Sequence, residues 1–171
     1  FMKDYPNARP YASNAGVGIM LKQYFKSYDF QRVKTGDTLS TGRYTLTFVE
    51  MPMIHWPDNM LTYVAEQKIA FSNDAFGQHI ASYDIFDDAH GAAKCIDRAK
   101  DYYANIVMPY GMQVANKLKQ IQDMNLDIDM IAPAHGIIWR SYLPALFQAY
   151  EDFATFKAVD KAVIVYESVW K

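Results

Sequence analysis

Apolar and polar positions change their spacing about halfway along the chain. Residues 44–49 alternate, with Leu46 and Phe48 on one side and Thr45 and Thr47 on the other, which predicts a half-buried strand. Residues 60–64 and 69–71 are two apolar runs joined by a polar turn, which predicts a β-hairpin. The remaining elements expected in this half are strands at 9–13 and 30–33 and a helix at 15–28, with turns at 36–37 and 41–43.

Helical spacing dominates the second half. An apolar stripe predicts a helix over residues 92–107, which Pro109 and Gly111 should end before a second helix over 114–124. A strand is expected at 128–132, a helix beginning with Pro144 at 144–156, and a last strand at 161–166. A β-rich half followed by alternating helices and strands predicts a layered α/β fold.

Composition narrows the class of protein. The chain has 171 residues, of which 51% are hydrophobic and 21% charged, as in one ordinary globular domain. The net charge of −2 and the lack of a basic block argue against nucleic-acid binding. No apolar run is long enough to span a membrane. The single cysteine, Cys95, cannot form an intrachain disulfide, so a reducing, cytoplasmic location is expected.

Three ligand-type side chains follow strand-like runs. They are His55 in MIHWPD, Asp74 in SNDAFGQH and His135 in APAHG. Strand ends converge at one edge of a sheet, and imidazole and carboxylate are suitable ligands for a first-row metal, so a shared metal site is predicted. His79 is either a pocket residue beside this site or a structural histidine, and His90 is interpreted as a loop residue.

Other signals are weaker. Asp87 and Asp88 have the pattern of a charge cluster at a helix N-terminus. The apolar run 161–166 leads to Ser168, as in the first strand of a nucleotide-binding domain, although an ordinary last strand gives the same pattern. The sequence has neither a nucleophile-elbow pattern nor a glycine-rich phosphate loop nor paired cysteines, so nothing in it supports acyl transfer.

At these residues the sequence resembles the flavodiiron proteins, or A-type flavoproteins. These join a metallo-β-lactamase-fold domain with a diiron site to a flavodoxin-like domain that holds FMN. The matching stretches are FQRVKTGDTLS (30–40), HWPD (55–58), FSNDAFGQH (71–79), YYANI (102–106), IAPAHGIIWR (131–140) and VIVYESVW (163–170). The resemblance implies the C-terminal part of a metallo-β-lactamase-like αββα sandwich over residues 1–159, and the first strand of the flavodoxin-like domain over 160–171.

The resemblance also implies roles for single residues. His55 and His135 would each bind one of two iron ions, and Asp74 would bridge them. Tyr103 would be the pocket tyrosine, and His79, five residues after Asp74, is predicted from its position to be catalytic with it. The opening of the FMN phosphate loop would be Ser168, Val169, Trp170 and Lys171.

The function implied is reduction of O2 to water, or of NO to N2O, with electrons that pass through FMN. The electron donor would be a rubredoxin-like protein or a flavin reductase, and the assembly a head-to-tail homodimer or a tetramer. The family's His-x-Glu-x-Asp cluster is missing, because no histidine precedes His55. The chain is therefore expected to be an internal fragment that exposes apolar surface, associates, binds iron poorly and is inactive alone. A binuclear zinc hydrolase of the same fold, or a non-catalytic remnant, are the alternatives.

Overall fold

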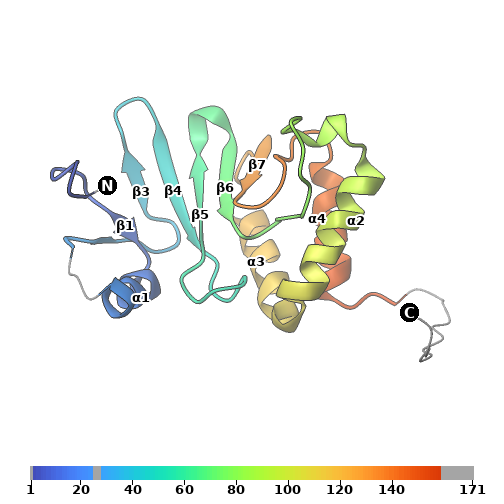
Figure 1. Ribbon diagram of the computed structural model, residues 1–171, viewed down its shortest axis with the longest axis horizontal. Coiled ribbons are helices and arrows are strands. Elements are labelled where there is room, and N and C mark those ends of the chain that lie inside the picture. Colours follow the sequence, from blue (N-terminus) through green and yellow to red (C-terminus); the bar gives the residue numbers. More distant parts are fainter. Residues whose placement is uncertain (1, 25–27, 159–171) are drawn as a thin grey trace.

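Five strands form the main sheet, in the order β3–β4–β5–β6–β7 (Figure 1). The computed structural model describes residues 2–24 and 28–158. Neighbouring strands are antiparallel except for β6 and β7, which are parallel. The strands are β3 (Thr38–Ser40), β4 (Thr45–Glu50), β5 (Met60–Val64), β6 (Ile69–Asn73) and β7 (Met130–Pro133).

The predicted β-hairpin is confirmed as β5 and β6. Val64 lies opposite Ile69, and the short 3₁₀ helix Ala65–Gln67 connects the two strands. Strand β3 was not predicted, because its three residues lie between two turn signals and are too few for alternation to be recognised. It extends the sheet by pairing with β4, with Thr38 opposite Thr47.

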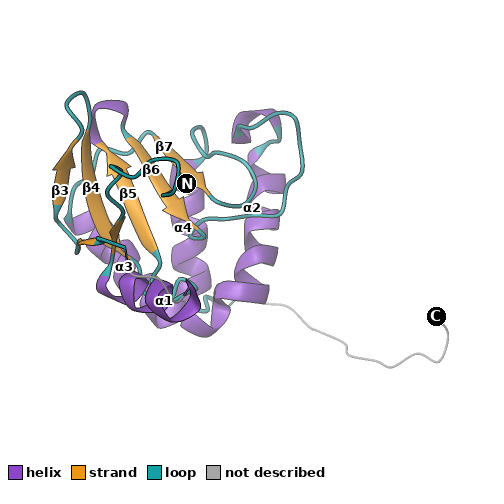
Figure 2. Cartoon of the chain, turned by 60° about the vertical axis from the view of Figure 1, so that its left-hand side comes forward, coloured by secondary structure: helices purple, strands orange, loops and turns teal. Residues whose placement is uncertain are grey.

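Three helices cover one face of this sheet (Figures 1 and 2). They are α2 (Ala92–Tyr102), α3 (Gly111–Asp123) and α4 (Leu143–Ala154). Between them and the strands lies the main core, in which burying each large apolar side chain contributes roughly 1.5–3 kcal/mol. Its central members are Leu61, Tyr63, Ala70 and Ile131 from the strands and Ala99, Tyr102, Val114, Leu118, Leu146 and Tyr150 from the helices.

The junction between α2 and α3 differs from the prediction. Helix α2 ends at Tyr102, and a π-helical turn (Tyr103–Val107) and a 3₁₀ turn (Met108–Tyr110) follow it. Pro109 lacks the N–H needed to continue the ladder. The prediction that Gly111 breaks a helix was wrong, since it begins α3. A Cβ there would lie 3.2 Å from the Ala154 carbonyl oxygen, so glycine allows α4 to approach closely.

A smaller unit lies beside the sheet. Strands β1 (Tyr11–Ala12) and β2 (Gln31–Arg32) are parallel, and helix α1 (Asn14–Tyr24) connects them. The Ser13 hydroxyl accepts the Gly16 N–H at 3.1 Å and so caps α1. The helix predicted over 15–28 was too long, because the Tyr28 carbonyl instead accepts the Phe30 N–H in a tight turn.

The sheet face away from the helices is apolar and partly open. Leu46, Val64, Ile69 and Met130 lie opposite one another on four adjacent strands. They line a shallow hollow of about 460 Å³, with Phe71 beside them 49% exposed. The apolar surface expected from the sequence is therefore present, while the association it predicts stays a prediction.

Two further expectations concern the whole chain. Among the helices of residues 2–24 and 28–158, none combines the length and apolar character that a membrane span requires. The predicted strand 161–166, the domain over 160–171 and the FMN residues Ser168, Val169, Trp170 and Lys171 lie outside the described residues.

Candidate metal centre

The three predicted ligands meet at one edge of the sheet. Strands β4, β6 and β7 run in the same direction, so their carboxyl ends share this edge. His55 lies in the loop between β4 and β5, Asp74 directly follows β6, and His135 lies two residues after β7. The sheet topology therefore brings together side chains that are far apart in the sequence.

The Asp74 carboxylate lies between the two imidazoles. Its Oδ2 is 3.4 Å from His55 Nε2, and its Oδ1 is 3.1 Å from His135 Nε2. The exposed fractions of the side chains are 15% for Asp74, 26% for His55 and 48% for His135. Each carboxylate oxygen thus faces a different histidine, at an edge that solvent reaches.

This donor arrangement fits a carboxylate shared by two ions. Two ligand atoms that bind the same ion at about 2.1 Å, at right angles to each other, lie about 3 Å apart, which is close to both separations between Nε2 and the carboxylate oxygens. Over the described ranges, no group of three or more His, Cys, Asp or Glu side chains could by itself hold an ion. The described residues thus bring together two imidazoles and one carboxylate, a donor set compatible with two ions but by itself insufficient to hold either.

A buried glutamine holds the loop of His135 against the segment that follows Asp74. The Gln78 side chain accepts the Ile137 N–H and donates to the Ile137 carbonyl, both at 2.8 Å, and its backbone N–H donates to the His135 carbonyl at 3.3 Å. The Trp139 indole N–H donates to the Phe76 carbonyl at 2.9 Å. These bonds fix His135 relative to Asp74.

Gly136 makes this approach possible. Its φ is +87°, and a Cβ there would lie 1.4 Å from Gln78 Oε1 and 2.3 Å from the Gln78 carbonyl oxygen. No other residue fits this position without displacing Gln78.

A second buried carboxylate holds the chain just beyond this loop. Asp87 is fully buried, and its oxygens accept the N–H groups of Ser141 and Tyr142 at 2.8–3.1 Å, at the start of α4. Asp87 and Asp88 also lie in the first turn of a 3₁₀ helix (Asp87–Ala89), which agrees with the predicted charge cluster at a helix N-terminus. Asp88 pairs with Arg140 on the surface at 2.7 Å.

Tyr102, and not Tyr103, faces the candidate ligands. Its ring centre is 5.7 Å from that of His135 and 5.2 Å from that of His79. The Tyr103 ring instead packs on Tyr150 and Phe153, at 5.5 and 5.2 Å. Neighbouring residues on a helix point about 100° apart, so only one of the two tyrosines can face the sheet edge.

The Tyr102 hydroxyl is buried and has no hydrogen-bond partner in the described part of the chain. Burial, and secondly the negative charge of Asp74, raise the pKa of Tyr102 to about 12. Tyr102 therefore stays protonated at neutral pH, and its ring lies beside that of His135.

The other two histidines lie further out. His79 is exposed, and its ring centre is 6.5 Å from that of His135, so it borders the site. His90 is hydrogen-bonded to the Asp84 carbonyl at 2.9 Å, in a loop as expected.

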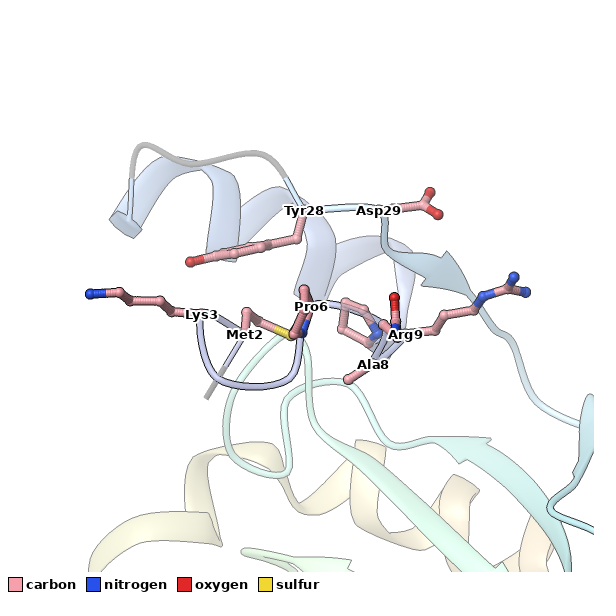
Figure 3. A pocket seen from close by; sticks show the side chains of 9 residues that line it. Met2, Lys3, Pro6, Ala8, Arg9, Tyr28 and Asp29 are labelled. Carbon is pink, nitrogen blue, oxygen red and sulfur yellow. The ribbon is translucent and has the colours of Figure 1, made fainter.

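A hollow of about 920 Å³ lies elsewhere, between the N-terminal segment and residues 28–29 (Figure 3). Lys3 and Arg9 extend from it in opposite directions, and Tyr28 lies near Met2. None of the candidate ligands lines it. The donor geometry, rather than the size of a hollow, therefore locates the candidate site.

Comparison with known proteins identifies the family. A family model described as "ODP family beta lactamase" matches residues 5–136. The chain belongs to this family. Membership in the ODP family accounts for the α/β architecture and confirms the predicted metallo-β-lactamase-like fold.

Relatives of this ODP-family chain carry redox names. It is 47% identical over 152 residues to a nitric oxide reductase of Moorella thermoacetica, covering 88% of this chain and 38% of the relative. It is 50% identical over 145 residues to an uncharacterized protein of Methanocaldococcus jannaschii, covering 85% and 36%. The chain thus spans little more than a third of the length of these relatives.

Solved structures agree with this assignment. The rubredoxin oxygen:oxidoreductase of Desulfovibrio gigas matches with a TM-score of 0.85 and 34% identity, over 88% of this chain and 38% of that one. A flavodiiron protein from Giardia intestinalis matches with a TM-score of 0.83 and 29% identity, over 91% and 39%. The predicted resemblance to the flavodiiron proteins is confirmed.

Proposed function

We propose that this chain supplies half of a non-heme diiron centre in a flavodiiron oxidoreductase that reduces O2 or NO. The observation that carries the proposal is the position of Asp74, whose two oxygens each face the Nε2 atom of a different histidine. His55 would hold one iron, His135 the other, and Asp74 both. Bound iron would supply the redox chemistry, which the side chains of the site cannot perform.

The residues of the chain itself would have three tasks. With two ions bound, the Asp74 carboxylate would supply a negative charge shared by both and so offset their repulsion. His55 and His135 leave the outer side of the site open, since both are partly exposed. The Tyr102 ring lies beside His79 and His135 and its hydroxyl stays protonated, so we propose it as the pocket tyrosine in place of Tyr103. His79 would border the entrance.

The redox function is favoured over the zinc hydrolase because the relatives carry redox names. In the whole protein we propose FMN as the source of electrons, with the phosphate loop opening at residues 168–171. We also propose a rubredoxin-like or flavin reductase donor and a head-to-tail homodimer or tetramer. These parts rest on the resemblance alone.

Cobalt(II) is a suitable probe for the ligand roles, because its visible absorption reports coordination. Anaerobic titration should give a d–d spectrum that Asp74→Asn largely abolishes, while His55→Ala and His135→Ala each remove part of it. His90→Ala is the matched control and should leave the spectrum unchanged. A spectrum insensitive to Asp74→Asn, or equally sensitive to His90→Ala, would contradict the proposed site.

Iron retention tests the incompleteness of the site. Each missing ligand or supporting group costs roughly 10–100-fold in metal affinity. After anaerobic Fe(II) loading and gel filtration, we expect far fewer than two irons per chain and no O2 or NO consumption. Two firmly retained irons per chain would show that the chain forms a complete site.

A further inference from the structure

Two asparagines join the three loops that carry the candidate ligands. Asn59 lies four residues after His55, and Asn73 directly precedes Asp74. Their hydrogen bonds reach the residue before each ligand: Ile54, Asn73 itself and Ala134. Within the described residues, the side-chain hydrogen bonds of Asn59 and Asn73 join them to Ile54 and to each other and not to a candidate ligand, so their role is indirect.

Asn59 anchors the loop of His55. Its side chain is 2% exposed, and its Nδ2 donates to the Ile54 carbonyl. Since a carbonyl only accepts, this bond fixes the orientation of the amide and leaves Oδ1 facing Asn73. Its backbone carbonyl accepts the Met51 N–H at 2.8 Å, which closes the base of the same loop.

Asn73 continues the connection to the other two loops. Its Nδ2 donates to Asn59 Oδ1 at 2.6 Å, and its own carbonyl accepts the Ala134 N–H at 2.6 Å. Its φ is +54°, in the left-handed region that asparagine tolerates better than most residues. The β6–β7 pairing is irregular between Phe71 and Asn73, so this bond replaces regular pairing where the ligands begin.

We propose that Asn59 and Asn73 are a positioning pair that sets the separations of His55, Asp74 and His135. The inference rests on the proposed metal site and goes further, by naming what holds its geometry. The chain of bonds runs from the Ile54 carbonyl through Asn59 and Asn73 to the Ala134 N–H. A displacement of one loop would therefore be transmitted to both others.

A positioning role of Asn59 and Asn73 can be distinguished from a purely structural one, because metal affinity depends more steeply than folding stability on the separations of the ligands. Loss of groups that orient ligands costs roughly 10–100-fold in metal affinity. A purely structural hydrogen bond would change the unfolding free energy and leave the metal spectrum unaltered. The two roles therefore separate when both quantities are measured.

The test compares Asn59→Ala, Asn73→Gly and the double variant. Glycine at 73 keeps the left-handed backbone and the carbonyl while removing the amide. Tyr63→Phe is the matched control, because it removes one side chain-to-backbone bond, to the Asp127 carbonyl at 2.7 Å, from the same sheet. Cobalt(II) affinity and the d–d spectrum are measured together with urea unfolding and amide exchange at Ala134.

We expect each asparagine variant to lose roughly 10–100-fold in cobalt(II) affinity with a shifted spectrum, and the double variant to lose no more than the stronger single one. Tyr63→Phe should lose stability only. Unchanged affinity in the asparagine variants, fully additive losses, or the same loss in Tyr63→Phe would overturn the inference.

Amide hydrogen exchange measured without metal tests the positioning pair independently of the proposed metal site. If Asp74→Asn leaves the cobalt(II) titration unchanged, the proposed metal site fails. The positioning pair is then judged by the Ala134 N–H, which Asn59→Ala should expose to faster exchange although the two residues share no direct bond. Unaltered exchange at Ala134 would overturn the pair by itself.

Discussion

Replacing Gly136 by alanine should lower the free energy of unfolding for two reasons, which a comparison with Gly42→Ala separates. The first is the left-handed backbone, with φ at +87°, and Gly42 has nearly the same φ of +88°. The second is contact, since a Cβ at 136 would meet Gln78 at 1.4 Å while one at 42 would meet nothing within 4 Å. Gly42→Ala is therefore a control that has the backbone cost alone.

The difference between the two variants can be derived from the contacts. A left-handed alanine costs roughly 1–3 kcal/mol at either position. At 136, Gln78 must also give up both side-chain bonds to Ile137, and each unpaired buried group costs roughly 1–3 kcal/mol. We expect Gly136→Ala to lose about 3 kcal/mol more than Gly42→Ala, a large part of a domain stability of roughly 5–15 kcal/mol.

Urea unfolding followed by circular dichroism measures both variants. Gly136→Ala should also weaken cobalt(II) binding, because Gln78 fixes the loop of His135, whereas Gly42→Ala should not. If the two variants differ by less than about 0.5 kcal/mol, the hydrogen bonds of Gln78 to Ile137 do not stabilise the fold.

Three further predictions use single side chains. Asp87→Ala should cost about 2 kcal/mol in urea unfolding, because it removes a buried carboxylate that accepts the part-buried N–H groups of Ser141 and Tyr142. An Asp88→Ala control on the surface should cost less than about 1 kcal/mol, and equal losses would refute the role of Asp87. Tyr102→Phe should leave the unfolding free energy unchanged or higher, since the Tyr102 hydroxyl has no hydrogen-bond partner among the described residues. Tyr63→Phe should lose about 1 kcal/mol, because it removes the bond to the Asp127 carbonyl, and the reverse order would be inconsistent with these contacts. Burial raises the pKa of Tyr102 to about 12, so its contribution to stability is complete below the unfolded pKa of about 10 and is lost as the pH rises from there to about 12. Across that range, the free energy of unfolding in urea should fall less steeply with pH in Tyr102→Phe, and identical slopes would speak against the shift.

The sequence predicted most elements because their patterns are local. The sequence of β4 alternates, the β5–β6 hairpin has a polar turn, and α4 has a proline in its first turn. Strand β3 has only three residues, and the π-helical turn at Tyr103 depends on how α2 packs against its neighbours, so neither has a local signal.

The candidate ligands were predicted from their position after strands, and the structure places them together. The residues that contact or position the ligands could not be predicted from their place after a strand. Tyr102 and Tyr103 are both buried, so burial cannot show which of them faces His135. Asn59 and Gln78 look like ordinary polar loop residues, and only their tertiary partners, Asn73 and Ile137, show what they do.

The change from antiparallel to parallel pairing at β6 affects the order in which the site can assemble. His55 and Asp74 are 19 residues apart and are joined through the β5–β6 hairpin, whereas Asp74 and His135 are 61 residues apart, across a crossover that contains α2 and α3. Closing the longer loop costs about 1 kcal/mol more in chain entropy. During folding, contacts that are distant in sequence generally form late. We therefore expect the pair of His55 and Asp74 to form first and His135 to arrive last, so pulse-labelling should protect the hairpin amides before those of β7.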